Sequence, residues 1–248
     1  MTAETGQTRR DYSEQILSGE GDNDYTRYMR TDTLLSLQRR PNEVAHRDEL
    51  LFQVVHQSTE LWLKLACSEL ATATESIRAR ELDTAIALIN RASLGIVLVT
   101  EQLEMMHHLS PWDFQTIRTI LGHGSGADSP GWRSVQRQGR RLGIAYMELV
   151  AVENIDLAEL YRTKVHSAEH RLAEAMIEWD ERVSLWRVRH YKLLTRVIGN
   201  QVIGTQGTQT DVLAKLIEYK FFPGLWKLRT ELTETGPMGQ YHLGVRHK

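Results

Sequence analysis

Cysteine, proline and long apolar runs are all scarce in this sequence of 248 residues. The one cysteine, Cys67, cannot form a disulfide within the chain and cannot build a multi-cysteine metal site. The first twenty residues are polar and charged, without the apolar stretch of a signal peptide, and we expect no run that could span a bilayer. These absences favour a cytoplasmic protein.

An excess of charge of one sign is also lacking, because 30 Lys and Arg residues stand against 32 Asp and Glu, a formal net charge of -2. Composition therefore gives no bulk electrostatic argument for nucleic acid or an anionic membrane as a partner. With 41% hydrophobic residues the chain is long enough to bury one sizeable core. We expect a polar N-terminal extension, residues 1–24, and a single domain, residues 25–248.

Helical periodicity dominates the rest of the chain. Only 5 prolines occur, and apolar residues recur at spacings of three and four, whereas alternating strand-like runs are scarce. The pattern predicts an all-α fold built as a bundle of long helices. The expected helices cover residues 25–39, 46–79, 81–108, 111–121, 131–153, 155–178, 180–199 and 210–220. Glycine-rich segments at 121–131 and 199–208 interrupt them, as binding loops or as simple turns.

His56 lies on an apolar helix face. It follows Phe52 by four residues and precedes Leu63 by seven, so the three side chains share one face. Such a histidine is either a satisfied core residue or a functional one. The residues alone leave both interpretations open.

His190 lies on a second apolar stripe, with Trp186, Leu193 and Val197. One imidazole among apolar side chains suits an axial ligand of heme iron, because a porphyrin needs apolar walls and one axial nitrogen. The neighbouring cations can pair with heme propionates or form a solvated basic face; they are Arg187, Arg189 and Arg196.

Arg118 shares a helix face with Phe114 and Leu121, just before the first glycine-rich segment. An arginine on an otherwise apolar stripe needs an anion, because an unpaired buried charge is costly. A substrate carboxylate bound by both guanidinium nitrogens is one such anion, and an internal salt bridge is the other.

Five segments, in order along the chain, resemble the tryptophan 2,3-dioxygenase family. The longest, LFQVVHQSTELWLKL at residues 51–65, is similar to the LFxxxHQxxELWxKL helix of that family. The other four are YTRYM at 25–29 before Asp32, LSP at 109–111 through Arg118, WRVRH at 186–190 through 196–199, and FPGLW at 222–226 before Arg229. Together they span residues 25 to 232.

The resemblance implies a homo-oligomeric enzyme, a dimer or tetramer, that binds heme b and uses O₂ to oxidise tryptophan or a close derivative. It implies His190 as the axial ligand of the heme iron, with Trp186 and Arg189 beside the heme, and His56 as the catalytic distal histidine. The substrate-binding residues that it implies are Phe52, Phe114, Arg118, Leu121, Thr205, Tyr25, Tyr28 and Met29. The last three belong to a segment that, in the family, reaches into a neighbouring subunit.

Departures from the family leave the reaction open. Residues 125–129 read SGADS where the family usually has SGFQS, and residues 204–207 read GTQG where it has GTGG. The interval between Arg118 and His190 is also shortened. Two products of tryptophan fit, N-formylkynurenine from dioxygenation or an oxindole-type product from insertion of one oxygen atom. A hydroxylase of tyrosine or methylated tyrosine is an alternative, and so is a heme or oxygen sensor or carrier. The presence of Arg118, His56 and Thr205 argues against the sensor or carrier, because carrying heme alone needs no ligand for a carboxylate.

Overall fold

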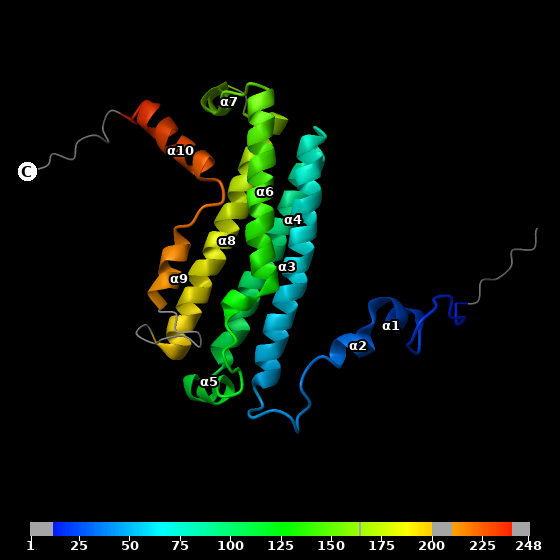
Figure 1. Ribbon diagram of the computed structural model, residues 1–248. Helices are drawn as coiled ribbons and strands as arrows, with labels where there is room; N and C mark the ends of the chain where they lie inside the picture. Colours follow the sequence, from blue (N-terminus) through cyan, green and yellow to red (C-terminus); the bar gives the residue numbers. More distant parts are fainter. Residues whose placement is uncertain (1–11, 164, 200–209, 240–248) are drawn as a thin grey trace, which may run out of the picture.

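The computed structural model describes residues 12–163, 165–199 and 210–239, and within them every regular element is a helix (Figure 1). The α-helices are α1 (Asp24–Met29), α2 (Thr31–Leu35), α3 (Glu49–Arg78), α4 (Leu82–Glu101), α5 (Pro111–Arg118), α6 (Pro130–Val152), α7 (Leu157–Thr163), α8 (Ala168–Ile198), α9 (Thr210–Ile217) and α10 (Pro223–Thr235). Two 3₁₀ helices, η1 (Gln102–His108) and η2 (Gly126–Asp128), accompany them. The predicted all-α fold is confirmed.

Four long helices, α3, α4, α6 and α8, form the body of the molecule (Figure 1). Helix α3 packs along α4 and α6, and α4 packs along α8. The apolar stripes predicted from the sequence point inward, so that Leu70, Ile89 and Leu142, from three different helices, are 0% exposed. Each such side chain contributes roughly 1.5–3 kcal/mol by its removal from water.

The stretch Leu82–His108 is long and apolar enough to cross a membrane, with a mean hydropathy of 1.6, so the expectation that no such run exists was wrong. Most of this stretch is α4, which contacts both α3 and α8. Its apolar side chains Ala85, Ile89 and Ile96 are 0% exposed. Burial in the bundle accounts for their apolar character.

The N-terminal part of the domain forms two short helices, so the predicted single helix 25–39 was wrong. Arg30 adopts a left-handed backbone conformation, with φ at 53°, which ends α1 and precedes α2. This N-terminal arm, residues 12–35, stands away from the bundle, and neither short helix buries a residue (Figure 1). The chain returns to α3 where the Gln38 side chain donates to Gln57 Oε1 at 2.6 Å.

Helix α8 runs without a break through residue 179, so the prediction of separate helices 155–178 and 180–199 was wrong. Trp179 and Asp180 are both 0% exposed in the middle of this helix. The helix begins after Ser167, whose hydroxyl accepts a hydrogen bond from the His170 backbone N–H at 3.2 Å. An N-cap of this kind satisfies a backbone donor that has no partner within the helix.

Two further helix ends differ from the sequence pattern. The predicted helix 81–108 is α-helical only to Glu101 and continues as the 3₁₀ helix η1. Helix α10 was not predicted; it begins at Pro223, whose missing N–H costs nothing at the first helical position.

The buried carboxylate of Asp180 holds the segment between α9 and α10 against α8. Its Oδ2 accepts hydrogen bonds from Phe221 N at 2.9 Å, Phe222 N at 3.1 Å and Trp226 Nε1 at 2.9 Å. The Phe221 ring packs on α6 at Gly139, where a Cβ atom would lie 2.6 Å from the ring. The segment therefore joins α8 to α6.

Replacing Asp180 with alanine leaves three N–H donors without an acceptor. Because each buried unsatisfied donor costs about 1–3 kcal/mol, we expect Asp180→Ala to lower the free energy of unfolding by about 3 kcal/mol or more, measured by urea denaturation. Asp83→Ala is the control, since Asp83 is 75% exposed and its ion pair with Arg171 contributes less than about 1 kcal/mol. Equal losses in the two variants would contradict the role of Asp180.

Candidate active site

A second apolar cluster lies at the end of the bundle that holds α5 (Figure 1). It joins the start of α3, η1, α5 and the last turns of α8, and we call it the α5-end cluster. Its members are Val55, Leu103, Met106, Leu109, Ile117, Leu193 and Val197, with Leu51, Phe52, Phe114, Leu121, Trp186 and Ile198 packed against them. The structure thus brings together four side chains that the sequence analysis placed beside a heme or its substrate: Phe52, Phe114, Leu121 and Trp186.

His56 lies at the edge of this cluster, with its ring centroid 4.1 Å from that of Phe52. Its Nδ1 is 2.7 Å from the Phe52 carbonyl oxygen, which can only accept, so Nδ1 carries the hydrogen and Nε2 keeps a lone pair. Desolvation lowers the pKa of His56, although the Phe52 carbonyl and the charge of Glu60 act in the opposite direction. The ring is therefore neutral at pH 7 and offers Nε2 as an acceptor.

His190 is the more strongly desolvated of the two imidazoles. Burial and, less strongly, the charge of a protonated His56 lower its pKa to about 4. The two rings are therefore close enough for a proton on His56 to affect the pKa of His190. A neutral imidazole with a free lone pair is the form of histidine that binds a metal ion.

Trp186 and Trp132 support the His190 ring. The rings of Trp186 and His190 are stacked, with centroids 4.8 Å apart and planes at 9°. Behind Trp186 lies Trp132, from the first turn of α6, at 3.7 Å between ring centroids. Sequence reasoning missed Trp132, because it belongs to another helix and its spacing along the chain carries no signal.

None of the remaining predicted residues that the structure describes belongs to this cluster. Arg118 ends α5 and donates to Gln115 Oε1 at 3.1 Å. Arg189 is exposed and forms an ion pair with Glu104 of η1. Thr205 lies outside the described residues. Three residues of the N-terminal arm are exposed: Tyr25 by 67%, Tyr28 by 77% and Met29 by 52%.

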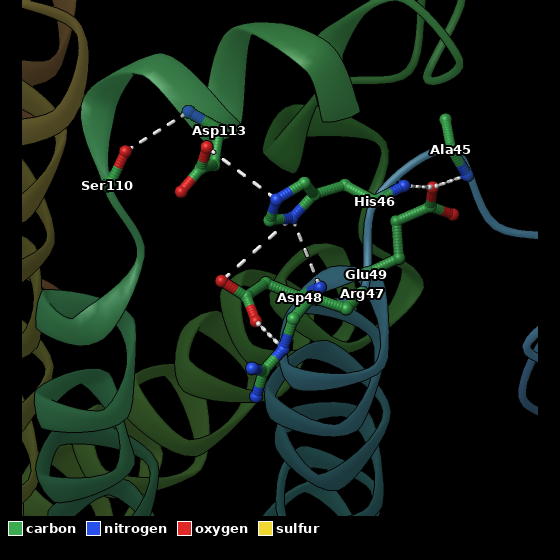
Figure 2. Close-up of polar contacts among 7 residues, drawn as sticks. All are labelled: Ala45, His46, Arg47, Asp48, Glu49, Ser110 and Asp113. Atoms are coloured by element: carbon green, nitrogen blue, oxygen red, sulfur yellow. Dashed lines mark hydrogen bonds and ion pairs between the residues drawn. The ribbon is translucent and has the colours of Figure 1, made fainter.

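Next to the cluster, the ends of α3 and α5 meet at His46, Asp48 and Asp113 (Figure 2). His46 Nε2 lies 3.6 Å from Asp113 Oδ1, and Nδ1 lies 3.9 Å from Asp48 Oδ2. These three residue types can hold a divalent metal ion. Whether they do so here depends on which imidazole nitrogen is unprotonated.

Hydrogen bonding at His46 argues against a metal ion at this place. The Asp48 backbone N–H donates to His46 Nδ1 at 3.2 Å, so Nδ1 supplies the lone pair and Nε2 carries the hydrogen that faces Asp113 (Figure 2). Asp48 Oδ1 is also engaged by Arg47 Nε at 3.2 Å. His46, Asp48 and Asp113 therefore form polar contacts that hold the first turn of α5 against the start of α3.

Fold and site together define an all-helical protein with a site lined by histidine and aromatic side chains. The sequence model of the tryptophan 2,3-dioxygenase family matches residues 10–148, and the chain belongs to that family. The tryptophan 2,3-dioxygenase of Bacillus thuringiensis subsp. konkukian is 28% identical over 90% of this chain and 95% of that protein. That of Arthrobacter sp. is 29% identical over 84% and 91%, and that of Myxococcus xanthus 28% over 86% and 91%. The predicted family, one of heme-dependent oxidoreductases, is confirmed.

Burial of His190 predicts a pH dependence for the protein purified without heme. In the unfolded chain an ordinary histidine binds a proton near pH 6.5, whereas folded His190 binds one only near pH 4. Between these values the unfolded state holds more protons, so the free energy of unfolding falls as the pH falls, by up to roughly 3 kcal/mol. Above pH 6.5 His190 is neutral in both states, so its desolvation no longer lowers the free energy of unfolding.

Replacing His190 with phenylalanine removes this titration. We expect the free energy of unfolding of His190→Phe to fall less steeply than that of the parent between pH 6.5 and pH 4, in urea denaturation at a series of pH values. The control His123→Phe changes an exposed histidine and should keep the parent's slope. A parent-like slope in His190→Phe would show that His190 is not desolvated.

Proposed function

We propose that this protein is a heme-dependent oxygenase that inserts oxygen from O₂ into the indole ring of L-tryptophan or a close derivative. The observation that carries the proposal is the pair of neutral imidazoles, one stacked on Trp186 and strongly desolvated, the other close enough to lower its pKa. The first suits a metal ligand, and the second suits a polar partner for a bound molecule. The relatives named tryptophan 2,3-dioxygenase supply the substrate class.

His190 fits the axial ligand of heme b by the chemistry of its surroundings. Desolvation keeps the ring unprotonated, and Leu193 and Val197 of the α5-end cluster offer the apolar surface that a porphyrin face needs. When bound, the heme supplies the activation of O₂. Arg189 forms an ion pair with Glu104, and it would hold a heme propionate in place of that carboxylate.

The chain's own residues then bind and orient the amino acid. An apolar wall for the aromatic ring consists of Phe52, Phe114 and Leu121. Because His56 donates Nδ1–H to the Phe52 carbonyl, its Nε2 can accept the N–H of an indole. Arg118 binds the substrate carboxylate, and Thr205 hydrogen-bonds the same head group. These contacts hold the ring in place and replace the solvation that water would otherwise provide.

The N-terminal arm completes the site in a homo-oligomer, a dimer or a tetramer. Helix α1 has six residues and buries none of them, and its Tyr25, Tyr28 and Met29 side chains are largely exposed. A helix this short is not stable in water on its own. We propose that the arm covers the α5-end cluster of a neighbouring subunit, where its aromatic rings exclude water from the bound substrate. A cytoplasmic location stays a prediction.

Heme content and product composition test the proposal. Heme-loaded parent protein should show a Soret band, and His190→Ala should lose heme or show an altered ligation spectrum, because no other histidine lies on that stripe of α8. The exposed control His123→Ala should keep the parent's spectrum. Full heme retention with an unchanged spectrum in His190→Ala contradicts the assignment.

The product identifies the reaction. Heme-loaded protein incubated with L-tryptophan under ¹⁸O₂ should give a product whose mass shows two labelled oxygen atoms for dioxygenation or one for an oxindole-type product. A product from tyrosine or methylated tyrosine, with none from tryptophan, would favour the alternative hydroxylase. Absence of turnover with each of these amino acids would favour a sensor.

Arg118 has a separate test. We expect Arg118→Ala to weaken L-tryptophan binding by about 2–5 kcal/mol, the usual cost of losing a charge-assisted pair, with unchanged heme content. Spectral titration of the heme-loaded protein measures the affinity. Arg140→Ala, an exposed arginine on α6, is the control and should bind as the parent does. If Arg118→Ala binds L-tryptophan as tightly as the parent does, Arg118 has only a structural role.

A further inference from the structure

Glu60 connects the helix of His56 to the helix of Trp132. It lies one turn after His56 on α3, and its carboxylate reaches the start of α6. There Oε1 accepts a hydrogen bond from the Ser129 hydroxyl, and Oε2 accepts one from Gly131 N at 2.9 Å. The Ser129 hydroxyl in turn accepts from Trp132 N at 3.0 Å. Glu60 and Ser129 together satisfy N–H groups that have no partner within α6.

Gly131 shows how closely α6 approaches this carboxylate. A Cβ atom at position 131 would lie 2.6 Å from Glu60 Oε2 and 2.8 Å from Leu63 Cδ1. Any residue with a side chain would therefore displace the carboxylate or the leucine. Glycine at this position allows the first turn of α6 to rest on α3.

The turn that Glu60 holds carries Trp132. The Trp132 ring packs on Trp186, and Trp186 stacks on His190. A displaced first turn of α6 would therefore move the ring behind Trp186. Because Trp132 and Trp186 are partly buried and pack against the core, we expect that displacement to reach the His190 ring.

Electrostatics favour a carboxylate at this position. A negative charge at the start of α6 is favourable, since the helix N-terminus carries a partial positive charge. A carboxylate therefore suits this position better than a neutral side chain.

We propose that Glu60 is a positioning residue of the oxygenation site: through the first turn of α6, Trp132 and Trp186, it sets the orientation of the His190 ring. This inference rests on the proposed function, in which His190 binds the heme iron. It concerns a residue to which the proposed function gives no contact with substrate or heme.

The test compares Glu60→Gln and Glu60→Ala with the parent, each loaded with heme. Glutamine keeps one acceptor oxygen for Gly131 N, and alanine keeps none. In the ferrous proteins we expect the iron–histidine stretching band in resonance Raman spectra to shift, more for alanine than for glutamine. We also expect kcat to fall by about 10-fold in Glu60→Ala, with a smaller change in KM, because partners that orient a metal ligand typically contribute 10- to 100-fold.

Ser167→Ala is the matched control. The substitution removes the N-cap of α8, because the Ser167 hydroxyl accepts a hydrogen bond from His170 N. Ser167 lies about 35 Å along the helix from His190. It should lower the urea midpoint without moving the iron–histidine band. Ser129→Ala removes one of the two contacts of Glu60 and should shift the band as Glu60→Gln does, so the test stands even if Glu60→Ala fails to fold.

The outcomes separate this inference from the proposed function. A band that shifts in the Glu60 and Ser129 variants but not in Ser167→Ala supports the positioning role. Heme-bound Glu60→Gln and Ser129→Ala proteins with the parent's band and kcat overturn it and leave the proposed function intact. A parent protein that binds no heme overturns both.

Discussion

A buried carboxylate on α8 holds the chain around the start of α10 against the helix that carries His190. Asp180 is 0% exposed, and a charge in such surroundings is strongly unfavourable unless hydrogen bonds replace its lost hydration. The segment between α9 and α10 supplies two backbone N–H groups, and the first turn of α10 supplies the indole N–H of Trp226, all to Asp180 Oδ2. That segment cannot leave α8 without leaving the charge unpaired. The fold therefore requires this segment to stay attached to α8.

The same face of α8 continues this attachment toward the site. Ser184 and Arg187, four and seven residues after Asp180, donate to the carbonyl oxygens of Ile217 at 3.0 Å and Tyr219 at 2.8 Å. An adjacent face carries an apolar stripe that runs through His190: Val183, Trp186, Leu193 and Val197. One helix thus has a polar face fixed to the following chain and an apolar face that presents an imidazole. Because the polar face is fixed to the following chain, the direction in which the apolar face and its imidazole point is fixed as well.

Sequence periodicity was sufficient for features that lie within one helix. It placed Phe52 with His56, and Trp186 with His190, because positions four apart share a face whatever packs against them. It failed at residue 179, where it separated two helices that the structure shows as the single helix α8. Asp180, next to this position, has its hydrogen-bond partners 41 and more residues further along. It also gave no sign of the left-handed Arg30, which divides the arm.

Contacts between distant segments were beyond the reach of the sequence pattern. The Glu60 carboxylate meets Ser129 and Gly131 across 69 and 71 residues, and Trp132 meets Trp186 from another helix. None of these pairs has a spacing that repeats, so a single sequence carries no signal for them. Family resemblance supplied roles for individual residues, whereas the supports of those residues came from the three-dimensional arrangement. The position of Thr205 lies outside the described residues and stays a prediction.

Desolvation acts on both imidazoles, but their neighbours make them unequal. His56 has a carbonyl acceptor and the charge of Glu60, and both raise its pKa against the effect of burial. His190 is more deeply desolvated, and burial together with the charge of a protonated His56 lowers its pKa to about 4. A proton on His56 makes protonation of His190 harder. The imidazole that we assign to iron therefore keeps its lone pair down to about pH 4.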